Sequence, residues 1–230
     1  MITFYNECYF LSNYRKERRK MDKQQNFTNN QNNPEKPGSD KKMKTKDLIY
    51  AGAFGAIYIV LMLIIVMGSG MIPILYLVAP LTVGLVCGTV YELCVLKVRK
   101  FGAALILGVL FALIAAAGNV IGLIAAIVAA LAAELIIKAG SYRSKKMYLA
   151  SFVVFNLNMA CPYIMLFLAR DKFLAIAAQY YGQTYADGLA ALAPNWIWLV
   201  TVGCAVLGGI GGAAIANKLI EKHFAKAGII

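Results

Sequence analysis

The stretch FGAALILGVLFALIAAAGNVIGLIAAIVAALAAELII, residues 101–137, decides the class of fold. It carries no charged residue before Glu134. As one helix it would be roughly 55 Å long, whereas the hydrocarbon core of a bilayer is about 30 Å thick. The segment must therefore fold back, and Gly118 and Asn119 form the expected hinge because glycine interrupts helices. We expect two antiparallel membrane-spanning helices joined by a tight turn.

Comparable apolar runs fill most of the rest of the chain. Of its 230 residues, 60% are hydrophobic and only 15% are charged. This composition is typical of an integral membrane protein rather than a soluble domain. The sequence predicts an all-α membrane protein, a bundle of six transmembrane helices, with a polar loop at residues 170–194 between the last two. The other four spans are expected at about residues 48–67, 74–93, 148–169 and 195–216.

The basic residues predict the orientation of this bundle. The formal net charge is +12, with nine of 23 Lys and Arg before Met43 and twelve in segments that flank hydrophobic runs. The flanking residues follow the second, fourth and sixth spans or precede the first. All of them lie on one side of the membrane if both termini are cytoplasmic, as the positive-inside rule requires. The basicity therefore indicates the orientation of the chain in the membrane and does not require a nucleic-acid partner.

Residues 1–42 differ from everything that follows. They contain the basic run RKERRK (15–20) and a polar, low-complexity stretch (24–42) that cannot bury enough apolar surface to fold. We predict a disordered tail over 1–42 and a transmembrane domain over 43–230. The tail either rests on anionic lipid or is dispensable, as it would be if translation starts at Met43, which opens MKTKDLIY.

The motifs of an enzyme are missing from the sequence. It has no HExxH, no Ser–His pairing and no P-loop, and its five cysteines form no CxxC pair. We expect neither catalysis, nor a cofactor, nor a metal site. Glu92 and Glu134 fall near the inner ends of spans, where each could couple protons; the favoured interpretation is a charge that reaches the interface beside a lysine.

The few polar groups deep in the apolar runs are candidate solute-binding residues. Asn156 and Asn158 lie in FNLNMACP, near the middle of the fifth span, with Pro162 one turn further on. A buried amide without a partner costs several kcal/mol, so each should face protein or a ligand. The alternative is hydrogen bonding between helices. Candidates at the span ends complete the solute-binding set: Asn119, Asn195, Tyr76 and Trp198.

Small residues form one face at the start of the first span. Ala51, Gly52, Gly55 and Ala56 fall within an arc of about 140° on a helical wheel, which permits close approach of another helix. Similar faces occur in the second, fourth and sixth spans, and packing within the bundle is the favoured explanation for all of them. The location of the first face, at the cytoplasmic end, also suits docking of a partner.

From Met43 onward, the sequence resembles the substrate-binding S components of energy-coupling factor (ECF) transporters, in particular the Trep_Strep or MptD-like group. The resemblance rests on the six-span topology, on KTKDLIYAGAFGAIY at the first span and on GCAVLGGIGGAAIANKL near the end. It implies a small-residue pair on the first helix, here Ala51 and Gly55 or the register Gly52 and Ala56, that packs on a transmembrane T subunit carrying two ATPases. It also implies a solute site in the outer half, capped by the loop after the first span.

Two functions are compatible with these features. The first is an ECF S component that captures a small, neutral or weakly polar, vitamin-like solute outside and delivers it inward. The second is a stand-alone membrane carrier or a structural or assembly subunit. A carrier would be expected to have a carboxylate at mid-membrane depth or an inverted repeat, and the sequence shows neither.

Overall fold

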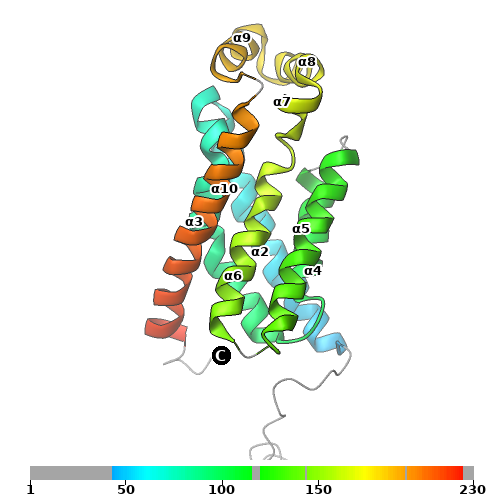
Figure 1. The fold of residues 1–230 in the computed structure, drawn as a ribbon, viewed down its shortest axis with the longest axis vertical. Helices are drawn as coiled ribbons and strands as arrows, with labels where there is room; N and C mark the ends of the chain where they lie inside the picture. The colour runs from blue at the N-terminus through cyan, green and yellow to red at the C-terminus, as the bar shows by residue number, and fades with distance from the viewer. Residues whose placement is uncertain (1–42, 116–119, 143, 195, 225–230) are drawn as a thin grey trace, which may run out of the picture. The chain divides into compact units, whose positions relative to one another are not determined.

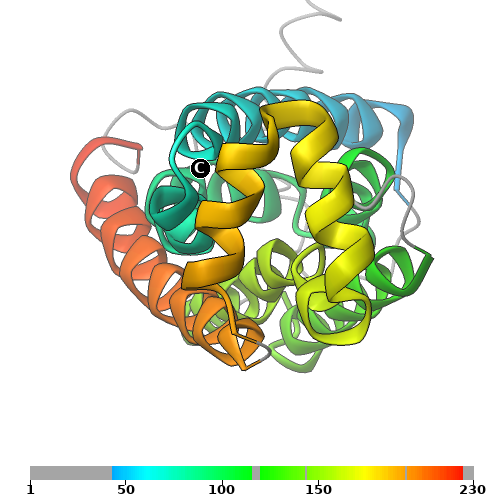
Figure 2. The same cartoon turned by 90° about the horizontal axis from the view of Figure 1, so that it is seen from above.

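The described part of the chain is a bundle of helices with two further helices lying across one end. The computed structural model describes residues 43–115, 120–142, 144–194 and 196–224, which are helical or in turns without a strand among them. Figure 1 shows the long helices running side by side, and Figure 2 shows α8 and α9 crossing over one end of the bundle. Residues 1–42, including the predicted tail, lie outside the described residues.

Four of the described helices are long and apolar enough to cross a membrane. They are α2 (Thr45–Gly70), α3 (Pro73–Val98), α5 (Val120–Ala139) and α10 (Ile197–Leu219), which continues as the π-helix η2 (Ile220–Phe224). The helix α4 (Ala103–Ala115) is apolar but shorter. Helices α4 and α5 run back along each other, as the length of the apolar stretch predicts, and the expected hinge at Gly118 and Asn119 lies outside the described residues.

The expected fifth span is broken in the middle. Helix α6 (Lys145–Asn156) passes into the 3₁₀-helix η1 (Leu157–Ala160), and the chain turns before the short α7 (Ile164–Leu168). Pro162 has no N–H to donate to the Asn158 carbonyl, which accepts the Cys161 N–H at 3.2 Å instead. The continuous helix expected from residue 148 to residue 169 is therefore corrected to two helices joined by a tighter turn.

Residues 170–194 are not the polar loop that the sequence suggested. They form α8 (Arg170–Tyr181) and α9 (Gln183–Leu192), joined at Gly182. Gly182 has φ +90°, a conformation that side chains rarely adopt, so glycine is needed at this turn. The Arg170 Nη2 donates to the Ala190 carbonyl at 2.6 Å, which ties the start of α8 to the end of α9.

Glycine lets α3, α10 and α6 approach until their backbones touch. A Cβ added to Gly208 would lie 2.7 Å from the Leu81 carbonyl oxygen, and one added to Gly84 would lie 2.5 Å from the Gly208 carbonyl carbon. A Cβ on Gly209 would lie 2.8 Å from the Cα of Val153 on α6. In these spans the small faces are used for packing within the bundle.

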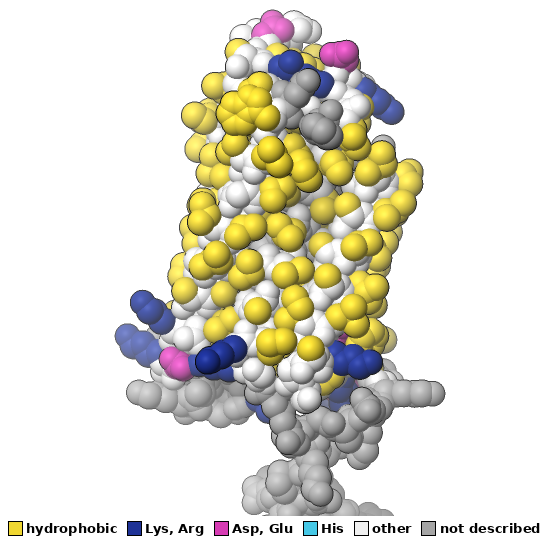
Figure 3. All heavy atoms as spheres, in the orientation of Figure 1, with side chains coloured by type: hydrophobic (Ala, Val, Ile, Leu, Met, Phe, Trp, Pro, Cys, Tyr) yellow, Lys and Arg dark blue, Asp and Glu magenta, His cyan; other side chains and the backbone are white. Residues whose placement is uncertain are grey.

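The charged ends of the bundle enclose an apolar middle. On the face in Figure 3, hydrophobic side chains cover the middle and charged side chains lie at the two ends. The starts of α2, α4 and α6 and the ends of α3, α5 and α10 share the end opposite α8 and α9. Ion pairs Lys100–Asp47 (2.7 Å) and Lys145–Glu221 join neighbouring segments there. We call this the basic end; Arg170 and Lys172 lie on α8, at the opposite end.

Candidate functional site

The helices α8 and α9 cover a small apolar core of their own, separate from the main core of the bundle. Ala186, Leu189 and Ala193 recur at helical spacing along α9 and its end, and all three are buried. They pack with Leu77 of α3 and Tyr163 beside α7, among other side chains. This periodicity is what seats α9 on the bundle, and we refer to α8 and α9 together as the cap.

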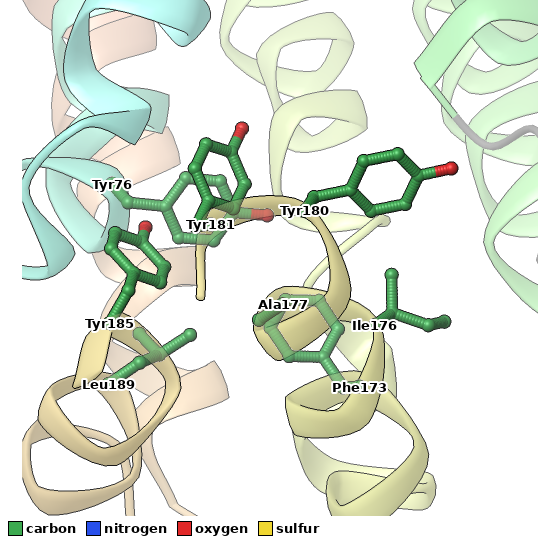
Figure 4. A pocket seen from close by; sticks show the side chains of 8 residues that line it. All are labelled: Tyr76, Phe173, Ile176, Ala177, Tyr180, Tyr181, Tyr185 and Leu189. Carbon is green, nitrogen blue, oxygen red and sulfur yellow. The ribbon is translucent and has the colours of Figure 1, made fainter. Parts of the chain in front are cut away.

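A pocket of about 90 Å³ lies between the cap and the start of α3. Figure 4 shows it from close by, with Tyr76 contributed by α3 and all other lining residues contributed by the cap. No charged side chain is among the described residues that line it. The lining consists of Tyr76, Phe173, Ile176, Ala177, Tyr180, Tyr181, Tyr185 and Leu189.

Aromatic rings dominate the lining and lie beside one another in pairs. The rings of Tyr181 and Tyr185 are stacked, with centroids 4.7 Å apart and planes 29° apart. Tyr76 and Phe173 have centroids 6.4 Å apart and planes 32° apart. The ring of Tyr180 points away from the others in Figure 4, and this side chain is 77% exposed.

One hydroxyl group in the lining is buried without a hydrogen bond. The Tyr185 hydroxyl oxygen has no partner among the described residues. Burial raises the pKa of Tyr185, with the neighbouring Tyr181 adding to the rise, so the hydroxyl remains protonated at neutral pH. Tyr185 can therefore both donate to and accept from a molecule in the pocket.

The broken fifth segment supports the pocket through two hydrogen bonds. Pro80 leaves the Tyr76 carbonyl without its helical donor, and the Tyr163 hydroxyl donates to that carbonyl at 2.6 Å. The indole Nε1 of Trp198 donates to the Ala160 carbonyl at 3.3 Å. The turn at Pro162 thus holds Tyr76 and α10 in place beneath the cap.

The sequence-predicted solute-binding residues are only partly brought together. Of them, Tyr76 lines the pocket, while Trp198 packs in the cap core beside it. Asn156 lies deeper, where its Nδ2 donates to the carbonyls of Ala205 (2.6 Å) and Pro80 (3.2 Å), the bonding between helices that the alternative interpretation expected. Asn119 and Asn195 lie outside the described residues.

Asn158 differs from Asn156 in its surroundings. Its side chain is fully buried in η1, and neither amide atom has a hydrogen-bond partner among the described residues. It does not line the pocket. Its role as a solute contact stays a prediction. The reason for it is that a bound molecule or a water could supply the hydrogen bonds that this buried amide lacks.

The small face of α2 is divided between the inside and the outside of the bundle. Ala51 is 0% exposed, and a Cβ on Gly55 would lie 2.7 Å from the Leu110 side chain of α4. Ala56 is exposed, and a Cβ on Gly52 would meet no atom within 4 Å. Ala51 and Gly55 therefore pack against the chain itself, and the register Gly52 and Ala56 is the one open to a partner.

The two glutamates also differ from expectation, because both side chains are buried inside the bundle. Glu134 is fully buried, and its Oε2 accepts the N–H groups of Ala104 (2.9 Å) and Leu105 (3.3 Å). It caps the start of α4, where a carboxylate also complements the helix dipole. Glu92 is 1% exposed, and its Oε1 has no hydrogen-bond partner among the described residues.

No cluster of three or more His, Cys, Asp or Glu side chains with metal-binding geometry occurs in the described part of the chain. Cys87, Cys94 and Cys161 are free and buried, and Cys204 is free and half-buried. These thiols pack as small apolar groups, as expected for cysteine inside a bundle.

Sequence reasoning missed most of the pocket. Phe173, Tyr181 and Tyr185 lie in the segment expected to be a polar loop, and no candidate site residue is predicted there from the sequence. The tyrosines of QYYGQTYADG were a usable signal, since aromatic side chains on a helix with an apolar face pack against whatever lies beneath them.

The long apolar helices, the apolar belt and the charged ends define an integral membrane protein of the all-helical class. A family model described as hypothetical bacterial integral membrane protein (Trep_Strep) matches residues 45–226, and the chain belongs to this family. No curated protein and no solved structure matches the chain.

Proposed function

We propose that the chain is the solute-binding S component of an ECF-type transporter in the bacterial cytoplasmic membrane. In this proposal α4 and the broken α6–α7 segment complete six membrane crossings, with both termini inside. The basic end then faces the cytoplasm, in accord with the positive-inside rule. The cap and its pocket face outward, where an uptake system would capture its solute.

The observation that carries the proposal is the open small-residue face near the basic end of α2. Gly52 and Ala56 lie one helical turn apart, which is the spacing at which two helices approach closely. Their exposed neighbours are apolar: Ile49 is 65% exposed and Val60 is 55% exposed. A transmembrane helix of a T subunit could approach this small-residue face closely, within reach of the cytoplasm.

The division of labour between subunits accounts for what the sequence lacks. The chain has no P-loop, so ATP hydrolysis would come from two separate ATPases bound to the T subunit. The passive role of the S component would be to bind the solute beneath the cap and to present it to the rest of the transporter. The resemblance of the amino-acid sequence to S components favours the same assignment.

A second candidate function rests on Glu92. A buried carboxyl group with an unpartnered oxygen in a long apolar helix is a feature of proton-coupled carriers. If the chain works alone as such a carrier, the purified protein in liposomes should accumulate its solute under a proton gradient, and Glu92→Gln should abolish that uptake. An S component alone should show no gradient-driven uptake.

The proposed function is tested by isolation from native membranes. An affinity-tagged chain, extracted in mild detergent, should co-purify with a T subunit and a pair of ATPases, identified by quantitative mass spectrometry against an untagged control. A chain recovered alone, in a preparation where another ECF complex stays intact, would contradict the proposal.

A further inference from the structure

We infer that the pocket under the cap binds its solute through an uncharged, flat aromatic or heteroaromatic ring. The inference rests on the proposed function, because a ring bound in this pocket is a transported solute only if the chain is an S component. The binding itself belongs to this chain alone and can be measured without any partner.

The lining explains why the bound group should be uncharged. Five of the eight lining residues are aromatic and the other three are aliphatic. None of the four charged side chains of the cap lines the pocket, and two of them have hydrogen bonds elsewhere: Arg170 donates to the Ala190 carbonyl, and Asp187 accepts from the Gln183 amide at 2.8 Å. A charged group placed in the pocket would lose hydration without gaining an opposite charge in return.

The geometry of the rings explains why the bound group should be flat. The ring planes of Tyr181 and Tyr185 differ by 29°, those of Tyr76 and Phe173 by 32°. Tyr181 and Tyr185 lie too close together for a ring to enter between them, but the same rings line the pocket, which we call the slot, and a planar ring there can pack on them by offset stacking. A round quaternary ammonium group would instead need ring faces converging on one point from several directions, and these paired planes do not provide them.

The Tyr185 hydroxyl supplies a polar contact for a molecule in the slot. It is buried, lies at the pocket and has no hydrogen-bond partner among the described residues. A ring carrying a hydroxyl, carbonyl or ring nitrogen would satisfy it, whereas a plain hydrocarbon ring would leave it unpaired. The pocket therefore favours a ring with one polar substituent.

A matched set of small probes tests this class. Phenol, cyclohexanol, toluene, benzoate and tetramethylammonium are added to the full chain in lipid nanodiscs, and binding is followed by saturation-transfer NMR and titration. Phenol should bind most tightly. Toluene should bind about fivefold more weakly for want of the hydrogen bond, and cyclohexanol should bind more weakly than phenol for want of a flat face.

Variants locate the binding in the slot. Tyr181→Leu removes one stacked ring and should weaken phenol binding about three- to tenfold. Tyr185→Phe keeps the ring and should reduce the preference for phenol over toluene to near unity. Trp196→Leu is the matched control, because it removes an exposed aromatic ring that does not line the pocket, and it should change phenol binding less than twofold. Size-exclusion profiles confirm that each variant is folded.

Several results would overturn the inference. Equal binding of cyclohexanol and phenol would contradict the preference for a flat ring. Tighter binding of benzoate or tetramethylammonium than of phenol would contradict the preference for an uncharged group. If no probe binds, the pocket is not a binding site for such rings. If a T subunit co-purifies but phenol does not bind, only the solute class fails. If phenol binds but no T subunit co-purifies, the proposed transporter role fails and the pocket stands.

Discussion

The hydroxyl of Tyr163 donates a hydrogen bond to the carbonyl of Tyr76 at 2.6 Å, across 87 residues of sequence. Two prolines make this hydrogen bond necessary and possible. Pro80 leaves the Tyr76 carbonyl without a donor inside α3, and the turn at Pro162 places Tyr163 where it can supply one. Two prolines, one inside α3 and one in the turn before α7, thereby fix the floor of the pocket.

Removing that hydroxyl should loosen the pocket end of the bundle. Tyr163→Phe leaves the Tyr76 carbonyl unpaired in a buried place and should cost about 1 kcal/mol of stability. The thermal unfolding midpoint in detergent should fall by a few degrees. Tyr180→Phe removes a hydroxyl from an exposed ring and should leave the midpoint unchanged. Equal midpoints for both variants would show that the Tyr163 bond adds nothing.

The glycine contact between α3 and α10 should tolerate no side chain. In Gly208→Ala the new methyl group would lie 2.7 Å from the Leu81 carbonyl oxygen, so the helices must separate. We expect a loss of about 1–3 kcal/mol, measured as a lower unfolding midpoint. Gly203→Ala on the same helix meets no atom within 4 Å and should be neutral or stabilising, because alanine favours helix.

The two asparagines of the fifth segment should respond differently to the same change. Asn156→Leu removes the bonds to Pro80 and Ala205 and should lower the unfolding midpoint clearly. Asn158→Leu replaces an amide without a partner among the described residues, so the midpoint should hold or rise. We also expect Asn158→Leu to reduce the amount of co-purifying solute seen by mass spectrometry. Unchanged solute would remove Asn158 from the site.

Glu134 should matter for stability in a way that Glu92 does not. Glu134→Ala takes two backbone N–H bonds from the start of α4 and should cost about 1–2 kcal/mol. Glu92→Gln keeps the shape of a side chain whose Oε1 accepts no described bond and should leave the unfolding midpoint within error. The reverse order would contradict the assignment of Glu134 as the α4 cap.

The membrane class and the grouping of basic residues could be predicted from sequence because both depend on composition along the chain. The length of residues 101–137 forces a reversal whatever surrounds it, and α4 and α5 do lie antiparallel. The cap was missed because α8 and α9 are too polar to resemble spans, and their apolar face, with Ala186 and Leu189, is narrow.

The details of the site depend on tertiary contacts that sequence does not contain. Asn156 and Asn158 are the same residue type two positions apart, yet one bridges two helices and the other has no described partner. Likewise, Ala51 and Gly52 are neighbours on one small-residue face, but the helices packed against α2 decide which of them is covered. A helical wheel predicts which residues share a face but not which helix packs against that face.

The most direct test of the proposed function is a tryptophan at the open face of α2. Gly52→Trp and Ala56→Trp place a large side chain on this face and should reduce the recovered T subunit and ATPases at least tenfold in co-purification. Ala214→Trp, at an exposed position on α10, should leave recovery unchanged. Full recovery with both α2 variants, at equal expression and membrane insertion, would contradict docking through this face and with it the central claim.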